Sequence, residues 1–202
     1  MIALIDYDAG NIRSVEKALL KLGQDVCVTR DRETLLRADH VILPGVGAFG
    51  DAMEHLRMYG LVEVIREIIE QKTPFLGICM GLQLLFERSE EAPGVEGLGI
   101  LKGEVLKIPE GEGLKIPHMG WNSLRLQNDG RLFRGLSDEP YVYFVHSYYL
   151  KAEDERIVKA VTEYGTTIHA SVERENVFAC QFHPEKSSET GLQILRNFAG
   201  LA

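Results

Sequence analysis

One cysteine between two glycines is the first candidate for chemistry. Cys79 stands in GICMG, two residues from Gly77 and from Gly81. This spacing has the shape of the G-x-S-x-G nucleophile elbow, in which small flanking residues permit a tight turn from strand to helix. A helix beginning at Met80 would point its N-terminal amides toward the sulfur, which favours the thiolate and leaves the Met80 N–H free for an oxyanion. The alternative is a structural cysteine buried at a strand end.

A cysteine nucleophile also needs a base, and the segment QFHPEKS offers one. His183 follows a predicted strand, and Glu185 lies two residues further on, across a rigid proline. That carboxylate could orient the imidazole, as the third group does in other triads. The alternative is a solvated loop histidine beside an acidic residue. The presence of both segments in one chain favours a Cys-His-Glu triad.

The glycine loop GVGAFG (residues 45–50) fits the dinucleotide-binding pattern G-x-G-x-x-G. That fingerprint normally lies after the first strand, with an acidic residue at the end of the next strand. Here the loop follows the third predicted strand, and the carboxylates near the expected distance, Glu63 and Glu67, fall within a predicted helix. We therefore expect no dinucleotide. The loop is predicted to bring backbone amides toward Cys79, or to be simply a tight turn.

The elements that must position these groups alternate in the first half of the chain. Short apolar runs and amphipathic stretches predict strand–helix units in a parallel sheet. The predicted strands are residues 2–6, 25–29, 40–44 and 75–78, and the predicted helices are 12–22, 31–37, 51–58, 61–70 and 80–87. Asn11 is a candidate cap for the first helix, and Gly23 ends it.

From about residue 98 the pattern changes to short strands separated by turn residues. The predicted strands are 100–108, 118–124, 141–150, 156–164, 168–173 and 177–182, followed by a helix over 191–201 with Ser187 or Ser188 as its cap. The predicted fold is α/β. It is one domain over residues 1–202, with a central, mostly parallel sheet flanked by helices and antiparallel additions in the C-terminal half that join the same sheet.

Composition narrows the class of partner. The chain has 202 residues, 45% apolar and 26% charged, with a formal charge of −8, which argues against nucleic acid or an anionic membrane surface. The start of the chain lacks the pattern of a secretion signal, and no run approaches the ~20 apolar residues of a membrane span, so we expect a cytoplasmic protein. Cys27, Cys79 and Cys180 fit neither a disulfide framework nor a zinc site, and we expect no metal or cofactor.

Together GICMGLQ, PGVGAFGD and QFHPEKS resemble the class I, triad-type glutamine amidotransferases, in the expected order over nearly the whole chain. More narrowly, DYDAGNIRSV, EEAPGVEGLGI, IPHMGWN and YFVHSYY resemble the glutaminase subunits of imidazole glycerol phosphate synthase. Asp8 departs from this pattern, which has glycine there. The departure puts the local loop geometry in question rather than the chemistry.

The resemblance implies that Cys79 attacks the side-chain amide of L-glutamine, that His183 moves protons, and that Glu185 orients His183. Ammonia would pass to a cyclase subunit, the other half of a heterodimer in histidine biosynthesis. An oxyanion hole is implied for the amides of Met80 and of Val46 or Gly47. A glutamine pocket is implied for Gln83, His146, Ser147 and Tyr148. Partner contacts are implied for Asn11, His118, Trp121, Tyr143 and Lys186.

Alternatives remain for several of these residues and for the function. His146 could be a satisfied histidine among aromatic residues of a sheet, and Trp121 and Tyr143 could belong to the core. The whole chain could be a dormant binding or regulatory protein, or a stand-alone hydrolase of γ-glutamyl peptides or other amides. Because ammonia must be kept from protonation in bulk water, we expect the active site to open toward a buried protein interface.

Overall fold

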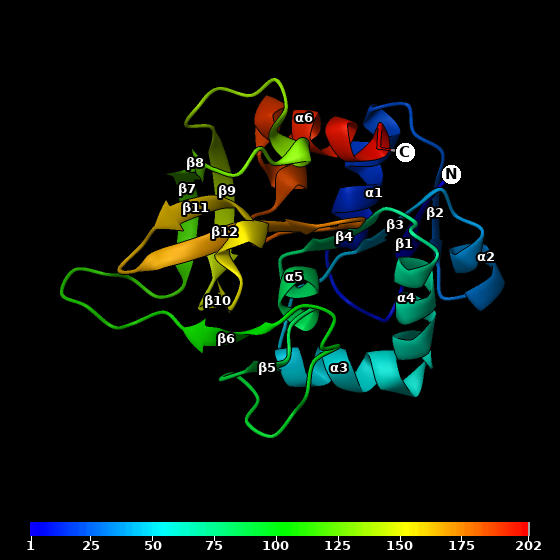
Figure 1. Ribbon diagram of the computed structural model, residues 1–202, viewed down its shortest axis with the longest axis horizontal. Coiled ribbons are helices and arrows are strands. Elements are labelled where there is room, and N and C mark those ends of the chain that lie inside the picture. Colours follow the sequence, from blue (N-terminus) through cyan, green and yellow to red (C-terminus); the bar gives the residue numbers. More distant parts are fainter. Residues whose placement is uncertain (202) are drawn as a thin grey trace.

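An eight-stranded sheet forms the central layer of the computed structural model, which describes residues 1–201 (Figure 1). Its order is β2 (Val26–Thr29), β1 (Ile2–Ile5), β3 (His40–Leu43), β4 (Phe75–Ile78), β13 (Val177–Cys180), β12 (Thr167–Arg174), β11 (Val158–Glu163) and β8 (Arg125–Leu126). The first five strands in this order run parallel, and the last three are antiparallel additions. The predicted fold class is confirmed.

Helices cover both faces of this sheet (Figure 1). One face carries α1 (Ile12–Lys21) and α6 (Ser188–Ala199), and the other carries α2 (Arg32–Leu36), α3 (Phe49–Met58), α4 (Leu61–Glu70) and α5 (Met80–Leu84). In β1, Ile2 and Leu4 pack with the first group while Ala3 and Ile5 pack with the second, because strand side chains alternate between faces. Four of the parallel strands, β1, β3, β4 and β13, are thus buried at every residue, whereas β2 at the edge is only partly buried. No helix within residues 1–201 is long and apolar enough to cross a membrane.

The second half of the chain departs from the prediction of one sheet. The predicted strand 141–150 is two strands, β9 (Tyr141–His146) and β10 (Tyr148–Ala152), separated by Ser147. The break lets β9 pair with β7 (His118–Ser123), while β10 pairs with β6 (Gly103–Lys107), which also pairs with β5 (Arg88–Ser89). The prediction that these strands join the main sheet is therefore wrong. Apolar alternation identified the strands but carries no information about which partner each one takes.

The side chains of the predicted cap residues Asn11 and Ser187 do not cap their helices. Asn11 precedes α1 in the left-handed region at φ 72°, and its side chain makes no capping bond. Ser187 precedes α6, but its hydroxyl donates to the His183 carbonyl at 2.6 Å and accepts from the Tyr143 amide at 2.9 Å. Helix α5 ends at Leu84, one turn earlier than predicted. Both would-be caps contact the candidate site instead.

Candidate active site

The candidate residues meet at the carboxyl ends of four neighbouring strands, β1, β3, β4 and β13. Because these strands are parallel, the loops that follow them emerge at one edge of the sheet. Asn11 follows β1, the glycine loop at 45–50 follows β3, Cys79 follows β4, and His183 follows β13. Segments that are distant in sequence thus form one site.

Cys79 occupies a strained turn between β4 and α5. Its backbone lies at φ 54° and ψ −104°, a region that residues with a side chain rarely adopt, and the residue is only 6% exposed. A Cβ on Gly77 would lie 2.6 Å from the Gly81 carbonyl oxygen, and one on Gly81 would lie 1.9 Å from the Leu43 carbonyl oxygen. The flanking glycines are therefore required by the close backbone approach, as the GICMG pattern predicts.

Gly81→Ala is expected to lower the free energy of unfolding by roughly 1–3 kcal/mol, because the added methyl group must displace the β3 backbone. Urea unfolding measures this difference. The control is Gly50→Ala in α3, where the new Cβ would have its nearest neighbour at 3.4 Å. Gly50→Ala is expected to be neutral or slightly stabilising, since alanine favours helix. Equal stability of the two variants would contradict the tight turn.

His183 and Glu185 form a buried pair behind Cys79. The His183 Nδ1 lies 2.7 Å from Glu185 Oε1, and both side chains are fully shielded from solvent. Nδ1 therefore carries a proton toward the carboxylate. Nε2 has no hydrogen-bond partner and is left to accept the proton of the thiol. Burial lowers the pKa of His183, but the contacts and charges of Cys79 and Glu185 outweigh burial and raise that pKa to about 9.

Asn11 extends this pair. Its Nδ2 donates to Glu185 Oε1 at 2.6 Å and lies 3.4 Å from His183 Nδ1. The amide thus fixes the carboxylate that fixes the imidazole. The sequence predicts Asn11 at a helix cap and at the partner surface, and no local signal connects it with residues more than 170 positions away.

The loop that carries Asn11 holds Asp8 at the position where the resemblance leads us to expect glycine. The backbone of Asp8 lies at φ 63°, in the left-handed region that glycine favours. The carboxylate accepts hydrogen bonds from Arg30 at 2.6 Å and from the Tyr59 hydroxyl. These bonds hold the pKa of Asp8 below its usual range and tie the loop to the residues that directly follow β2 and α3.

The predicted oxyanion hole is not open in this conformation. The Met80 N–H donates to the Gly45 carbonyl at 3.2 Å, so the prediction that this amide is free is wrong here. The Tyr7 hydroxyl, which donates to the Pro44 carbonyl at 2.8 Å, fixes the start of the glycine loop. The Gly45 carbonyl therefore engages the Met80 N–H that the predicted oxyanion hole requires.

A pocket of about 340 Å³ lies over Cys79. It collects all the residues predicted for the oxyanion hole and the glutamine pocket: Val46, Gly47, Met80, Gln83, His146, Ser147 and Tyr148. Glu91, Pro117 and Val145 complete the lining and were not predicted individually. Glu91 is anchored, because its Oε2 accepts from the Phe49 N–H at 2.8 Å.

His146 lines this pocket but has no ring nitrogen free for a ligand. Its Nδ1 donates to the Tyr148 carbonyl at 2.8 Å, and its Nε2 lies 2.9 Å from His118 Nδ1. Burial lowers the pKa of His146 to about 3 and that of His118 to about 4, so both rings are neutral. The geometry supports the structural alternative for His146 rather than contact with glutamine.

The predicted partner-contact residues separate into two groups. His118 is buried between Phe144 and Tyr164, with ring centroids 4.7 Å and 3.9 Å away. Trp121, in contrast, is 52% exposed and meets Tyr143 edge to face across β7 and β9. The same face of these strands exposes Met119 and Tyr141, which makes an apolar surface, and Lys186 is exposed beside the triad.

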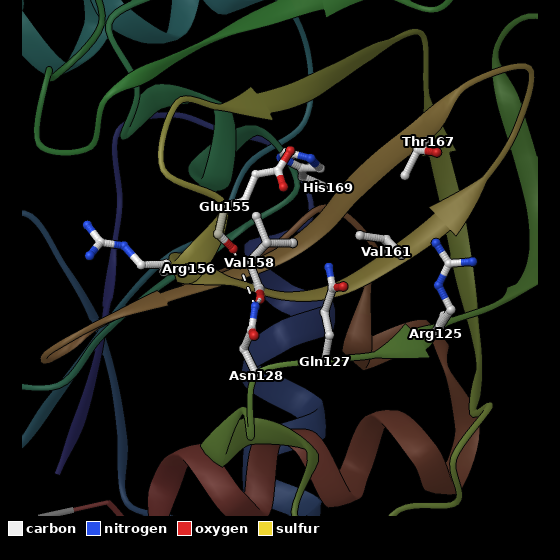
Figure 2. Close-up of a pocket in the computed structure, with 9 residues that line it drawn as sticks. All are labelled: Arg125, Gln127, Asn128, Glu155, Arg156, Val158, Val161, Thr167 and His169. Carbon is white, nitrogen blue, oxygen red and sulfur yellow. Dashed lines mark hydrogen bonds between the residues drawn. The ribbon is translucent and has the colours of Figure 1, made fainter.

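A second hollow, of about 420 Å³, lies against β8, β11 and β12 (Figure 2). Arg125 and Arg156 stand at its opposite ends, and each has a carboxylate partner, Glu163 and Asp154 respectively. The side-chain amide of Asn128 donates a hydrogen bond to the Val158 carbonyl at 2.8 Å. Within residues 1–201 no three His, Cys, Asp or Glu side chains form a metal-binding group.

Related sequences cover the whole fold. The family profile described as glutamine amidotransferase class-I matches residues 3–200. The chain is 55% identical over 201 residues to imidazole glycerol phosphate synthase subunit HisH of Bacillus cereus (strain G9842), covering 100% of this chain and 95% of that protein. It is 50% identical over 201 residues to subunit HisH of Methanocaldococcus jannaschii, covering 100% of both.

Solved structures agree on the architecture. A crystal structure of a glutamine amidotransferase matches with a TM-score of 0.76 at 22% identity, over 98% of this chain and 100% of that chain. PurLQS from Thermotoga maritima matches with a TM-score of 0.75 at 22% identity, over 98% of this chain and 96% of that chain. These low identities support the fold alone. By its profile match and its full-length relatives, the chain belongs to the class I glutamine amidotransferases and, within them, to the HisH subunits of imidazole glycerol phosphate synthase.

Proposed function

We propose that the chain hydrolyses L-glutamine to glutamate and ammonia at Cys79, and delivers the ammonia to the cyclase subunit of an imidazole glycerol phosphate synthase heterodimer. The observation that carries the chemistry is the buried pair His183–Glu185 behind a strained, pocket-facing cysteine. Family membership supports the choice of glutamine, and the names of the relatives support the choice of partner.

The reaction follows from the proton positions. His183 Nε2 takes the thiol proton, and the sulfur attacks the amide carbon of glutamine. The tetrahedral intermediate collapses when the imidazolium gives its proton to the departing nitrogen, which leaves as ammonia. A water molecule then adds to the thioester, giving one proton to His183, and the C–S bond breaks with its electron pair returning to sulfur. Glu185 keeps the imidazole in the required tautomer throughout.

The oxyanion needs a rearranged glycine loop. In a trans peptide the C=O and N–H point in opposite directions, so rotating the Gly45–Val46 peptide would turn the Gly45 carbonyl away and bring the Val46 N–H into its place. The same rotation would release the Met80 N–H from its bond to Gly45. Both amides would then face the oxyanion, which they would stabilise during attack and during hydrolysis. The conformation described here is therefore one of low activity.

The pocket supplies groups that suit the amino-acid end of glutamine. The Glu91 carboxylate provides a negative charge for the α-ammonium group. The Gln83 Oε1 is buried without a hydrogen-bond partner and would accept an N–H from the ligand. The Ser147–Tyr148 segment, at the break between β9 and β10, closes the far side of the pocket.

The apolar face of β7 and β9 is the proposed site of cyclase contact. Met119, Trp121 and Tyr141 are more than half exposed on one side of this ladder, and aromatic residues of this kind commonly anchor protein interfaces. Val145, opposite Met119 on the same ladder, also lines the pocket over Cys79. The pocket thus adjoins this face, which suits transfer of ammonia into a covered interface.

Glutamate release is expected to rise when the cyclase subunit and its nucleotide substrate are added, because the closed glycine loop must rearrange first. The measurement is glutamate formed from glutamine by this chain alone, with the cyclase subunit, and with the subunit plus its substrate. Turnover that the cyclase leaves unchanged would instead favour a stand-alone amide hydrolase. Absence of turnover in all three mixtures would favour a dormant binding protein.

A further inference from the structure

We infer that Gln181, the first residue of the QFHPEKS segment and one to which the sequence assigns no role, holds the Cys79 sulfur through a hydrogen bond and stabilises its thiolate form. The inference rests on the proposed cysteine chemistry. Gln181 follows β13 and is fully buried, and its Nε2 lies 3.6 Å from the Cys79 Sγ. A buried amide is costly unless its polar atoms are paired, so its position beside the nucleophile requires an explanation.

The direction of the Gln181 amide is fixed by its neighbours. Gln83 Nε2 donates to the Tyr148 carbonyl at 3.1 Å, and because a carbonyl can only accept, the NH₂ group of Gln83 must lie on that side. The same NH₂ donates to Gln181 at 3.0 Å, so the facing atom of Gln181 is its Oε1. The NH₂ of Gln181 is consequently turned toward Cys79.

The Tyr148 carbonyl, at which this series of hydrogen bonds starts, accepts two of them. The Tyr148 carbonyl also accepts from His146 Nδ1 at 2.8 Å, so both of its lone pairs are used. His146 Nε2 must then accept from His118 Nδ1 at 2.9 Å, and His118 Nε2 accepts from Asn122 at 3.3 Å. A fully determined polar network therefore runs from β7 to the nucleophile. It also gives the paired histidines, whose ring nitrogens are all engaged within the protein, a reason to be buried there.

A neutral amide suits the task. A hydrogen bond to an ionised acceptor is stronger than one to the neutral form, so Gln181 favours the thiolate over the thiol. An amide neither gains nor loses a proton near neutral pH, so it does not compete with His183 for the thiol proton. When the C–S bond of the thioester breaks, the electron pair returns to sulfur, and the Gln181 N–H meets the charge that forms there.

Gln181→Leu and Gln181→Glu test this contact without glutamine. The measurement is the rate of alkylation of Cys79 by iodoacetamide against pH, with the Cys79 peptide followed by mass spectrometry so that Cys27 and Cys180 do not contribute. Gln181→Leu is expected to move the pH midpoint of alkylation upward by roughly one unit. Gln181→Glu is expected to move it further, because a carboxylate would then face the thiolate.

The control is Gln193→Leu in α6, which makes the same change at a remote site. The Gln193 amide bonds only neighbours on its own helix, so the alkylation midpoint of this variant is expected to match wild type. Gln181→Glu, nearly identical in shape to wild type, carries the test if Gln181→Leu does not fold. An unchanged midpoint in folded Gln181→Glu overturns the inference. Because alkylation requires no substrate, a shift without any glutaminase activity would refute the proposed function and leave the Gln181 contact standing.

Discussion

Replacing Cys79 by alanine is expected to reduce glutamate release from glutamine by at least about 10⁴-fold, since no other group in the pocket can form the thioester. The loss should appear in kcat whether or not the cyclase subunit and its substrate are present. Binding of the cyclase should persist, because Cys79 is almost wholly buried and lies beneath the pocket rather than on the apolar face of β7 and β9.

Two comparisons make the Cys79 prediction specific. Cys27→Ala removes a half-buried thiol on β2, outside the pocket lining, and is expected to leave activity unchanged. Cys79→Gly should be as inactive as Cys79→Ala but more stable to urea by about 1 kcal/mol, because glycine adopts φ 54° without strain. Residual activity of Cys79→Ala near the wild-type level would mean that another nucleophile does the chemistry.

The fold class could be predicted because its evidence is local. The parallel strands other than the edge strand β2 are short, mostly apolar runs that are buried at every residue, since both of their faces are covered by helices. The turn at Cys79 can also be predicted from the sequence, because glycines such as Gly77 and Gly81 are needed where two backbones come so close. Chemistry that depends on residue type near a strand end is therefore visible in sequence, including the spacing of His183 and Glu185.

The remaining features depend on contacts between distant segments. The bond from Gln181 to Cys79 spans 102 positions, and that from Asn11 to Glu185 spans 174, so no periodicity in the sequence contains them. Whether the Met80 N–H is bonded depends on the direction of one peptide in the glycine loop, because it donates to the Gly45 carbonyl. A loop with glycines permits both directions of that peptide. For His146 the sequence leaves both a glutamine contact and a structural role open, because sequence cannot show that its two nitrogens are already satisfied.

Glu185→Gln is the second large effect, and it separates the charge of the triad carboxylate from its shape. Asn11 Nδ2 would still donate to the remaining oxygen of the side chain, which keeps that oxygen directed at His183 Nδ1. What is lost is the negative charge, which together with the contacts of Cys79 opposes the effect of burial, so the pKa of His183 falls below about 9. The imidazolium becomes costly to form, and kcat/KM is expected to fall by between about 10² and 10⁴-fold.

The same substitution has a predictable effect on stability against pH. A histidine whose pKa is raised on folding contributes stability that is fully present below its unfolded value of about 6.5 and is lost as pH rises through about 9. Wild type should therefore lose this contribution between pH 6.5 and pH 9, and Glu185→Gln should show a smaller loss over that interval. Urea unfolding at several pH values measures the difference.

Glu189→Gln, the same change at an exposed position in α6, is the control and should follow wild type. If Glu185→Gln also followed wild type in both activity and pH dependence, the carboxylate would not be what sets the proton on His183.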